Sequence, residues 1–128
     1  MKYVEPALKR AQEFFGKRAR DPARLAEMAA RLTADVEGTG VPRADIVIEA
    51  IFENADAKRA LYAALEPRMK PDALLATNTS SIVLEELARG LSDPGRLVGL
   101  HFFNPVAKMM LVEIIRSQLT RPEVVEDT

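Results

Sequence analysis

The stretch that decides the fold is residues 46–52, which read Ile-Val-Ile-Glu-Ala-Ile-Phe. β-Branched residues dominate this stretch, and its apolar residues follow one another almost without a break. A strand buried on both faces has this composition, and such strands are typical of parallel sheets. The stretch therefore predicts a buried strand of a parallel sheet.

The segments that follow alternate between helix and strand patterns. Asn54 is placed to cap a helix whose apolar residues recur at helical spacing. Short apolar strands are predicted at residues 74–77 and 97–100, with a helix at residues 84–91 between them. Strand–helix–strand alternation is the pattern of right-handed crossovers in one parallel sheet. A fourth strand, residues 111–115, follows a link too short for such a crossover, so antiparallel pairing is predicted there.

The predicted fold class is α/β: a partial Rossmann-like parallel sheet with flanking helices and an N-terminal helical hairpin. Residues 1–43 are expected to hold the hairpin and a glycine-containing loop, with a helix break near Gly16 and a helix start at Asp21-Pro22. Residues 44–116 carry the sheet. Residues 117–128 are polar and are expected to be a fraying tail.

Composition excludes several classes of protein. The 128 residues include 18 Lys or Arg and 19 Asp or Glu, so the net charge of −1 lacks the basic excess of a nucleic-acid-binding protein. Cysteine is absent, which excludes disulfides and thiolate metal sites and fits a cytoplasmic protein. No apolar run approaches the roughly 20 residues that span a bilayer.

Polar residues with catalytic potential lie near the predicted strand ends. His101 is the only histidine, Glu113 follows it by twelve residues, and Ser80 precedes it by twenty-one. In a parallel sheet, ligands bind outside the carboxyl ends of the strands, so these three side chains are expected to converge there. A histidine oriented by a carboxylate is suited to removing a proton from an alcohol.

Each of these residues also has a simpler interpretation. A single histidine after a strand is more often a structural residue, and Glu113 could be an exposed charge on an edge strand. Ser80 and Ser81 could cap the next helix, and Lys58 could be a solvated lysine in the first turns of a helix. The Met109-Met110 pair is more simply explained by packing than by an acyl channel.

The motifs together resemble a known family. They are the segment of residues 44–54, the run Asn78-Thr79-Ser80-Ser81, and the run His101-Phe102-Phe103-Asn104-Pro105 followed by Leu111-Val112-Glu113. In this order and spacing they resemble the 3-hydroxyacyl-CoA dehydrogenases of fatty-acid β-oxidation. The resemblance is closest to the dehydrogenase part of the multifunctional fatty-oxidation proteins, and it runs from about Tyr3 to about Arg116.

The resemblance implies NAD-dependent oxidation of a (3S)-3-hydroxyacyl-CoA to a 3-ketoacyl-CoA, without a metal. His101 would be the general base, and Glu113 would orient its imidazole. Ser80 would hydrogen-bond the reacting oxygen or the cofactor. Glu53 and Lys58 match positions that contact NAD in the family, and Asn104 would have a supporting role.

The resemblance also implies that the chain is an internal piece of a dehydrogenase. Family members begin with a strand, a G-x-G-x-x-G turn and a helix, and the Gly38-Thr39-Gly40 run does not match that context. The helical second domain of the family is not matched either. We therefore expect poor NAD binding by the isolated chain, and either self-association or association with the missing parts along the edge beside residues 46–52.

Two alternatives to an enzyme remain open at this stage. The chain could be an inactive remnant or an interaction module derived from the family. It could also be a generic α/β scaffold whose motifs are coincidental, although chance would then have to preserve three polar motifs in order.

Overall fold

The computed structural model describes residues 4–128, so the start of the expected resemblance at Tyr3 lies outside the described residues. The chain forms two compact units, Met1–Gly40 and Val41–Thr128. The candidate site residues named above all lie in the second unit.

The first unit holds a helical hairpin, as predicted. It consists of α1 (Val4–Arg18) and α2 (Pro22–Ala30). The Asp21 carboxylate caps α2 by accepting a hydrogen bond from the Ala23 backbone N–H at 3.0 Å. The expected break near Gly16 is wrong, because α1 continues through that residue.

The loop after the hairpin is held by Asp35. Its carboxylate accepts hydrogen bonds from the backbone N–H groups of Thr39 and Gly40, and these bonds lower its pKa. A short 3₁₀ turn, η1 (Val41–Arg43), then begins the second unit. The predicted loop is therefore present, and it contains this one turn.

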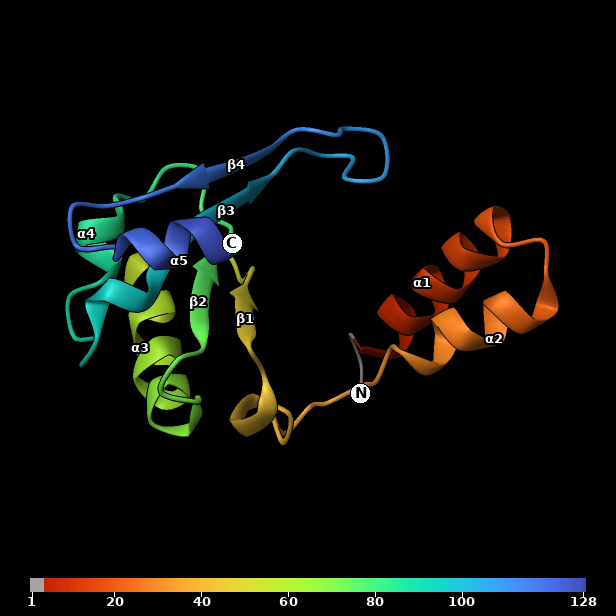
Figure 1. Ribbon diagram of the computed structural model, residues 1–128, viewed down its shortest axis with the longest axis horizontal. Helices are drawn as coiled ribbons and strands as arrows, with labels where there is room; N and C mark the ends of the chain where they lie inside the picture. The colour runs from red at the N-terminus through yellow and green to blue at the C-terminus, as the bar shows by residue number, and fades with distance from the viewer. Residues whose placement is uncertain (1–3) are drawn as a thin grey trace. The chain divides into compact units, whose positions relative to one another are not determined.

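The second unit is built on a four-stranded sheet with the order β1-β2-β3-β4 (Figure 1). Its strands are β1 (Ile46–Glu49), β2 (Leu74–Thr77), β3 (Leu97–Phe102) and β4 (Val112–Ile115). The first three pair in parallel, and β4 pairs antiparallel with β3. Both predictions of strand direction are confirmed.

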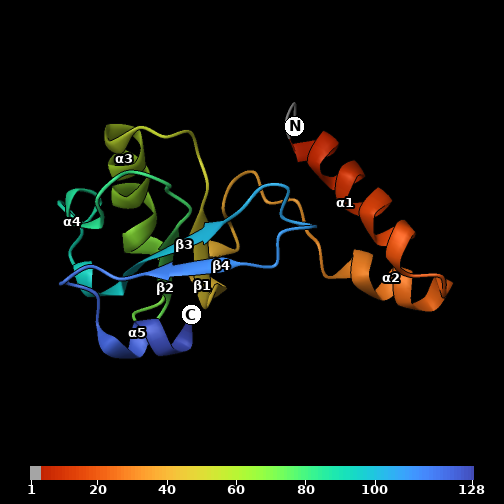
Figure 2. The same ribbon diagram turned by 90° about the horizontal axis from the view of Figure 1, so that it is seen from above.

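Helices cover both faces of this sheet (Figure 2). On one face lie α3 (Ala55–Leu65), which Asn54 caps through the Ala57 N–H, and the short α4 (Leu84–Leu87). On the other face lies α5 (Pro122–Asp127). Short 3₁₀ turns, η2 (Glu66–Arg68) and η3 (Pro94–Arg96), precede β2 and β3.

Two apolar clusters form the core of the second unit, one on each face of the sheet. The cluster under α3 and α4 consists of Tyr62, Met69, Ala73, Leu75, Leu84, Leu87, Ala88 and Leu97. The cluster under α5 consists of Leu74, Ala76, Val98, Leu100 and Val124. Successive residues of β2 and β3 therefore contribute to opposite faces, as the pleat of a strand requires.

The structure corrects the prediction for residues 46–52 in two respects. The strand ends at Glu49, and its face toward α5 is not buried, since Ile46 and Ile48 are 41% and 51% exposed. The reason is position: β1 is an edge strand within the described residues, and α5 packs on β3. Apolar continuity indicated the strand but could not indicate which neighbours would cover it.

The predicted fraying tail is also wrong. Residues 122–127 form α5, and the Val124 side chain is buried against the sheet at 1% exposure. The Arg121 guanidinium bonds both carboxylate oxygens of Asp93, at 2.6 and 2.8 Å, which fixes the start of this helix. The buried valine, this ion pair and the hydrogen bond from the Arg121 N–H to the Gly95 carbonyl oxygen hold a segment whose composition is polar.

The predicted helix at residues 84–91 is shorter than expected. It ends at Leu87, and Gly90 follows in the left-handed region with φ of 98°.

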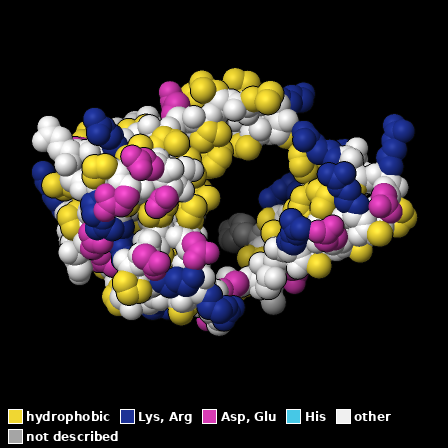
Figure 3. Space-filling model, viewed as in Figure 1, with side chains coloured by type: hydrophobic (Ala, Val, Ile, Leu, Met, Phe, Trp, Pro, Cys, Tyr) yellow, Lys and Arg dark blue, Asp and Glu magenta, His cyan; other side chains and the backbone are white. Residues whose placement is uncertain are grey.

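The segment between β3 and β4 projects exposed apolar side chains, among them Val106, Met109 and Met110. Figure 3 shows hydrophobic side chains along the β3–β4 hairpin, at the top of the view. No helix of the described chain is both long and apolar enough to cross a bilayer.

Candidate functional site

A histidine and a carboxylate meet across the β3–β4 ladder. His101 and Glu113 are register partners, and the imidazole Nδ1 lies 2.9 Å from a Glu113 carboxylate oxygen. The predicted contact between them is confirmed. The His101 ring also meets the edge of the Phe103 ring at a centroid distance of 4.7 Å.

The position of His101 leaves its second ring nitrogen available. Within the described residues, Nε2 makes no hydrogen bond, and the side chain is 19% exposed. If Nδ1 carries the proton that Glu113 accepts, then Nε2 presents a lone pair to the surroundings. This half-buried imidazole can accept a proton from a bound ligand.

The second part of the site is the turn after β2, residues 79–81, which we call the serine turn. Next to it, the Asn78 side-chain oxygen accepts a hydrogen bond from the Phe102 backbone N–H at 3.0 Å. This bond joins the carboxyl end of β2 to the end of β3. The serine turn therefore starts beside the strand that carries His101.

Glu53 holds the serine turn from the end of β1. One oxygen of its carboxylate accepts hydrogen bonds from the Thr79 hydroxyl, the Ser80 N–H at 3.0 Å, and the N–H and hydroxyl of Ser81 at 3.3 and 3.2 Å. Partial burial opposes ionisation of Glu53, but these bonds and nearby Lys58 outweigh it and lower its pKa to about 2. The carboxylate is therefore ionised over the whole neutral range.

The three hydroxyl groups of the serine turn differ in their availability. Those of Thr79 and Ser81 are bonded to Glu53. The Ser80 side chain is exposed, and its hydroxyl makes no hydrogen bond within the part of the chain that the structure describes. Ser80 is thus the member of the turn that can bond a ligand without losing an existing partner.

Beneath the serine turn lies a buried polar cluster of Glu49, Lys58, Tyr62 and Thr77. The Glu49 carboxylate receives the Lys58 ammonium on one oxygen and the hydroxyls of Tyr62 and Thr77 on the other, each at 2.8 Å. Burial alone would raise the pKa of Glu49, yet these donors together lower it. Burial and the adjacent Glu49 charge raise the pKa of Tyr62, so its hydroxyl stays a donor.

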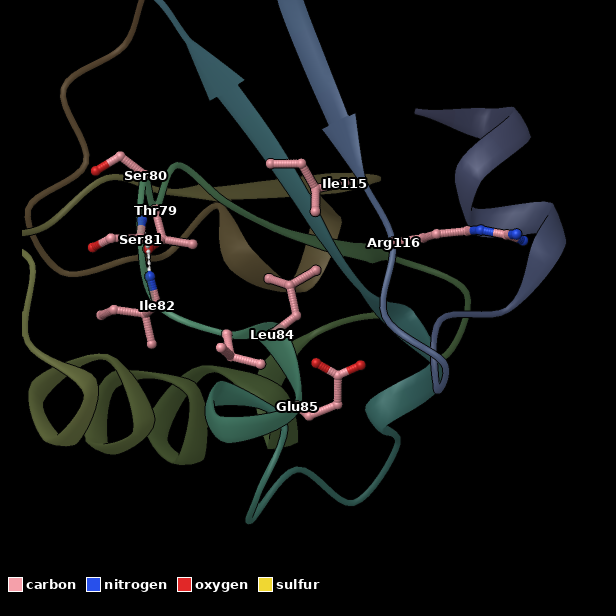
Figure 4. Close-up of a pocket in the computed structure, with 9 residues that line it drawn as sticks. Thr79, Ser80, Ser81, Ile82, Leu84, Glu85, Ile115 and Arg116 are labelled. Carbon is pink, nitrogen blue, oxygen red and sulfur yellow. Dashed lines mark hydrogen bonds between the residues drawn. The ribbon is translucent and has the colours of Figure 1, made fainter.

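A shallow pocket of about 270 Å³ opens beside the serine turn (Figure 4). Ser80 and Ser81 lie at one side, Ile115 of β4 lies opposite, and Leu84 lies between them (Figure 4). Ile115 and Glu113 share one face of β4, because residues two apart in a strand point the same way. The pocket therefore adjoins the face of the hairpin that carries the His101–Glu113 pair.

The remaining predicted site residues stand as follows. Lys58 is fully buried, and its ammonium also lies 3.4 Å from Glu53. Asn104 is exposed in the segment after β3. No hydrogen bond joins Ser80 to His101 among residues 4–128, so a ligand shared by the two stays a prediction. No group of three acidic or histidine side chains in the same residues could hold a metal ion.

Reasoning from sequence missed Glu49, Tyr62 and Thr77. The signal for Glu49 was present, since a single carboxylate interrupts an apolar strand and must find a partner when buried. Lys58, nine residues later on α3, is that partner. Nothing in the sequence indicated the two hydroxyl donors, because they come from elements that only the fold brings together.

The arrangement has the parts for removing a proton from an alcohol. It offers an imidazole with one nitrogen oriented by a carboxylate, a free serine hydroxyl, and a hydroxyl-lined carboxyl edge of a parallel sheet. The donor set also fits the nicotinamide end of NAD, because carboxylate, amide and hydroxyl groups can hydrogen-bond ribose hydroxyls and a carboxamide. Glu53, Asn78 and Ser80 supply one group of each kind.

Comparison with known proteins identifies relatives of this chain. The family model described as 3-hydroxyacyl-CoA dehydrogenase, NAD binding domain, matches residues 2–128. A probable 3-hydroxyacyl-CoA dehydrogenase of Caenorhabditis elegans is 50% identical over 91 residues, which is 71% of this chain and 30% of that protein.

Solved structures agree with that match. The chain resembles 3-hydroxybutyryl-CoA dehydrogenase from Escherichia coli K12 with a TM-score of 0.88 and 36% identity, over 97% of this chain and 27% of that one. It also resembles the dehydrogenase part of multifunctional enzyme 1 from C. elegans, with a TM-score of 0.75 and 35% identity, over 91% of this chain and 27% of that one. The chain thus spans about a third or less of the length of these relatives.

Proposed function

The chain belongs to the 3-hydroxyacyl-CoA dehydrogenases, whose NAD-binding domain it matches, and from this membership we propose that it serves NAD-dependent oxidation of (3S)-3-hydroxyacyl-CoA to 3-ketoacyl-CoA in fatty-acid β-oxidation. The observation that carries the proposal is the His101–Glu113 pair at 2.9 Å with the second imidazole nitrogen free. The carboxylate on Nδ1 orients the imidazole and leaves Nε2 to accept a proton.

The proton path begins at the substrate hydroxyl. His101 Nε2 accepts the hydroxyl proton as the C3–O bond becomes a carbonyl, and the imidazole becomes an imidazolium. Glu113 holds the Nδ1 proton, which fixes the reactive tautomer and then stabilises the positive charge. The Ser80 hydroxyl donates a hydrogen bond to the same substrate oxygen and positions it for His101.

NAD would be held in part by Glu53 and by the polar groups of the serine turn. When bound, its chemistry is acceptance of a hydride from C3 at the nicotinamide ring. Two electrons and one proton thus leave C3 together, and the hydroxyl proton leaves to His101. This chain contributes position and electrostatics to that exchange.

The pocket beside the serine turn supports the assignment of an acyl substrate. Its walls include Ile82, Leu84 and Ile115, which offer apolar surface next to the Ser80 hydroxyl. We assign this pocket to part of the acyl group. Cytoplasmic location and self-association, both expected from the sequence, stay predictions.

The test is NADH formation from NAD and a 3-hydroxyacyl-CoA by the full-length gene product. Wild-type turnover that His101→Gln lowers by roughly 10²–10⁴-fold would support the proposal, and Lys70→Met, which changes a surface residue outside the site, should turn over normally. Absence of turnover in a wild type that folds and binds NAD would favour the inactive remnant or interaction module.

A further inference from the structure

A continuous series of contacts runs from the buried polar cluster to the serine turn. It begins at the Tyr62 and Thr77 hydroxyls, which both donate to one Glu49 oxygen. The other Glu49 oxygen accepts from the Lys58 ammonium at 2.8 Å and from the Ile51 N–H at 2.6 Å. Four donors therefore fix both oxygens of Glu49.

Lys58 is the link between the two carboxylates. Its ammonium lies 2.8 Å from Glu49, 3.4 Å from the Glu53 carboxylate and 3.4 Å from the Ile51 carbonyl oxygen. Two of the three ammonium donors hydrogen-bond Glu49 and Ile51, and the charge forms an ion pair with Glu53. The side chain is also 0% exposed. In this conformation Lys58 has no exposed surface with which to bind a ligand.

Glu53 divides its two oxygens between these partners. One oxygen lies against Lys58, and the other receives the donors of Thr79, Ser80 and Ser81. Anchoring the first oxygen fixes the plane of the carboxylate, and that plane determines where the second oxygen meets the turn. The Lys58 charge also offsets the repulsion between the Glu49 and Glu53 carboxylates.

We propose that Lys58 is a positioning residue: its buried ammonium fixes the Glu53 carboxylate, and Glu53 in turn sets the conformation of the serine turn that presents Ser80. Tyr62 belongs to the same series because it anchors Glu49. This assignment replaces a direct contact between Lys58 and the cofactor. That the turn receives substrate or cofactor rests on the proposed function, whereas the series of contacts does not.

The first arm of the test measures the conformation of the serine turn by NMR in the absence of ligand. In amide NMR spectra of the 128-residue chain, the Ser80 and Ser81 N–H protons should appear downfield because they donate to a carboxylate. Glu53→Gln removes that charge and should move both resonances upfield. Lys58→Met should move them in the same direction, and the double variant should show no shift beyond that of Glu53→Gln.

Two further variants make this arm decisive. Lys70→Met is the matched control, because Lys70 pairs with Asp45 at the surface, and both resonances should keep their wild-type positions. Tyr62→Phe removes one hydroxyl from the series and should shift both resonances upfield by less than Lys58→Met. If Lys58→Met does not fold, the Ser80 and Ser81 resonances of Tyr62→Phe test the proposal instead. Wild-type Ser80 and Ser81 resonances in whichever variant folds would overturn the proposal.

The second arm separates this proposal from the function on which it rests. In the full-length gene product, Lys58→Met and Glu53→Gln should lower kcat by similar factors, and the double variant should lose no more than the single ones. Shifted resonances with unchanged turnover would leave the positioning role standing and remove the serine turn from the active site. Lost turnover with unshifted resonances would overturn the positioning role.

Discussion

His101 and Glu113 face each other as register partners of an antiparallel ladder, with imidazole Nδ1 2.9 Å from the carboxylate. Because both residues lie on strands, backbone pairing sets their approach independently of any loop. The pair therefore exists before a ligand arrives, which is what a preorganised base requires.

His101→Gln should lower dehydrogenase turnover of the full-length gene product by roughly 10²–10⁴-fold, because a general base contributes about that much. Glu113→Gln should lower it as well, since the imidazolium would lose its charged partner. The double variant should be little worse than His101→Gln, because the two residues act as a unit. Calorimetric NAD affinity should stay at the wild-type value in all three, and near wild-type turnover of His101→Gln would remove the proposed base.

Acidification should release the serine turn through Glu53. The pKa of this carboxyl is about 2 in the folded chain against an ordinary value of 4.5. Its ionised form therefore adds stability that is complete above about pH 4.5 and is lost as the pH falls toward 2. Denaturant unfolding of the wild type and Glu53→Gln should show a stability difference that shrinks across this window. A difference that is constant with pH would contradict the assignment.

Gly99→Ala should destabilise the sheet next to the site. A Cβ at Gly99 would lie 2.9 Å from the Ile115 Cβ, which is closer than real contacts allow, and 3.3 Å from the Ile115 carbonyl oxygen, which is tight. Moving β4 to relieve this overlap should cost about 1–3 kcal/mol in the free energy of unfolding. It should also disturb the adjacent His101–Glu113 pair, which a change in the imidazole NMR signals would report.

Gly16→Ala is the matched control for that change. No heavy atom lies within 4 Å of a Cβ built at Gly16, and the residue is inside α1. The same substitution should therefore stabilise that helix by roughly 0.5–1 kcal/mol. Equal effects of the two variants on the free energy of unfolding would show that the contact with Ile115 does not destabilise Gly99→Ala.

Val124→Ala should test whether α5 belongs to the core. This side chain is 1% exposed between α5 and the sheet, so its truncation should cost about 2 kcal/mol in the free energy of unfolding. Val106→Ala, at a position that is 56% exposed, should change that free energy by less than about 0.5 kcal/mol. If α5 were a frayed tail, the two substitutions would have the same small effect.

The strands and their directions could be predicted from the sequence because they depend on local patterns. The bounds of β2, residues 74–77, match the prediction, and β4 pairs antiparallel because its link to β3 is short. The burial of a side chain depends on segments that are distant in the sequence, and the predictions of burial were wrong. Ile46 and Ile48 looked buried but lie on an edge, while Val124 looked exposed but lies in the core.

Part of the candidate site could likewise be predicted from the sequence, and part could not. His101 and Glu113 could be paired from their places on neighbouring strands. The buried polar cluster beneath the serine turn could not be predicted, because Tyr62 and Thr77 reach Glu49 from a helix and a different strand. Lys58 looked like a solvated lysine in its own segment, and only the packing of α3 on the sheet buries its charge.

The burial of Lys58 has a consequence for the response of this protein to dissolved ions. Mobile ions screen charge pairs that solvent can reach, and they act much less on pairs inside the protein. The Lys70–Asp45 pair at the surface should weaken as salt is added, whereas the Lys58–Glu49 pair has no solvent contact through which screening could act. The anchor of Lys58 on Glu49 should therefore be insensitive to ionic strength, and added salt can act on the support of the serine turn only through Glu53, whose side chain is 36% exposed.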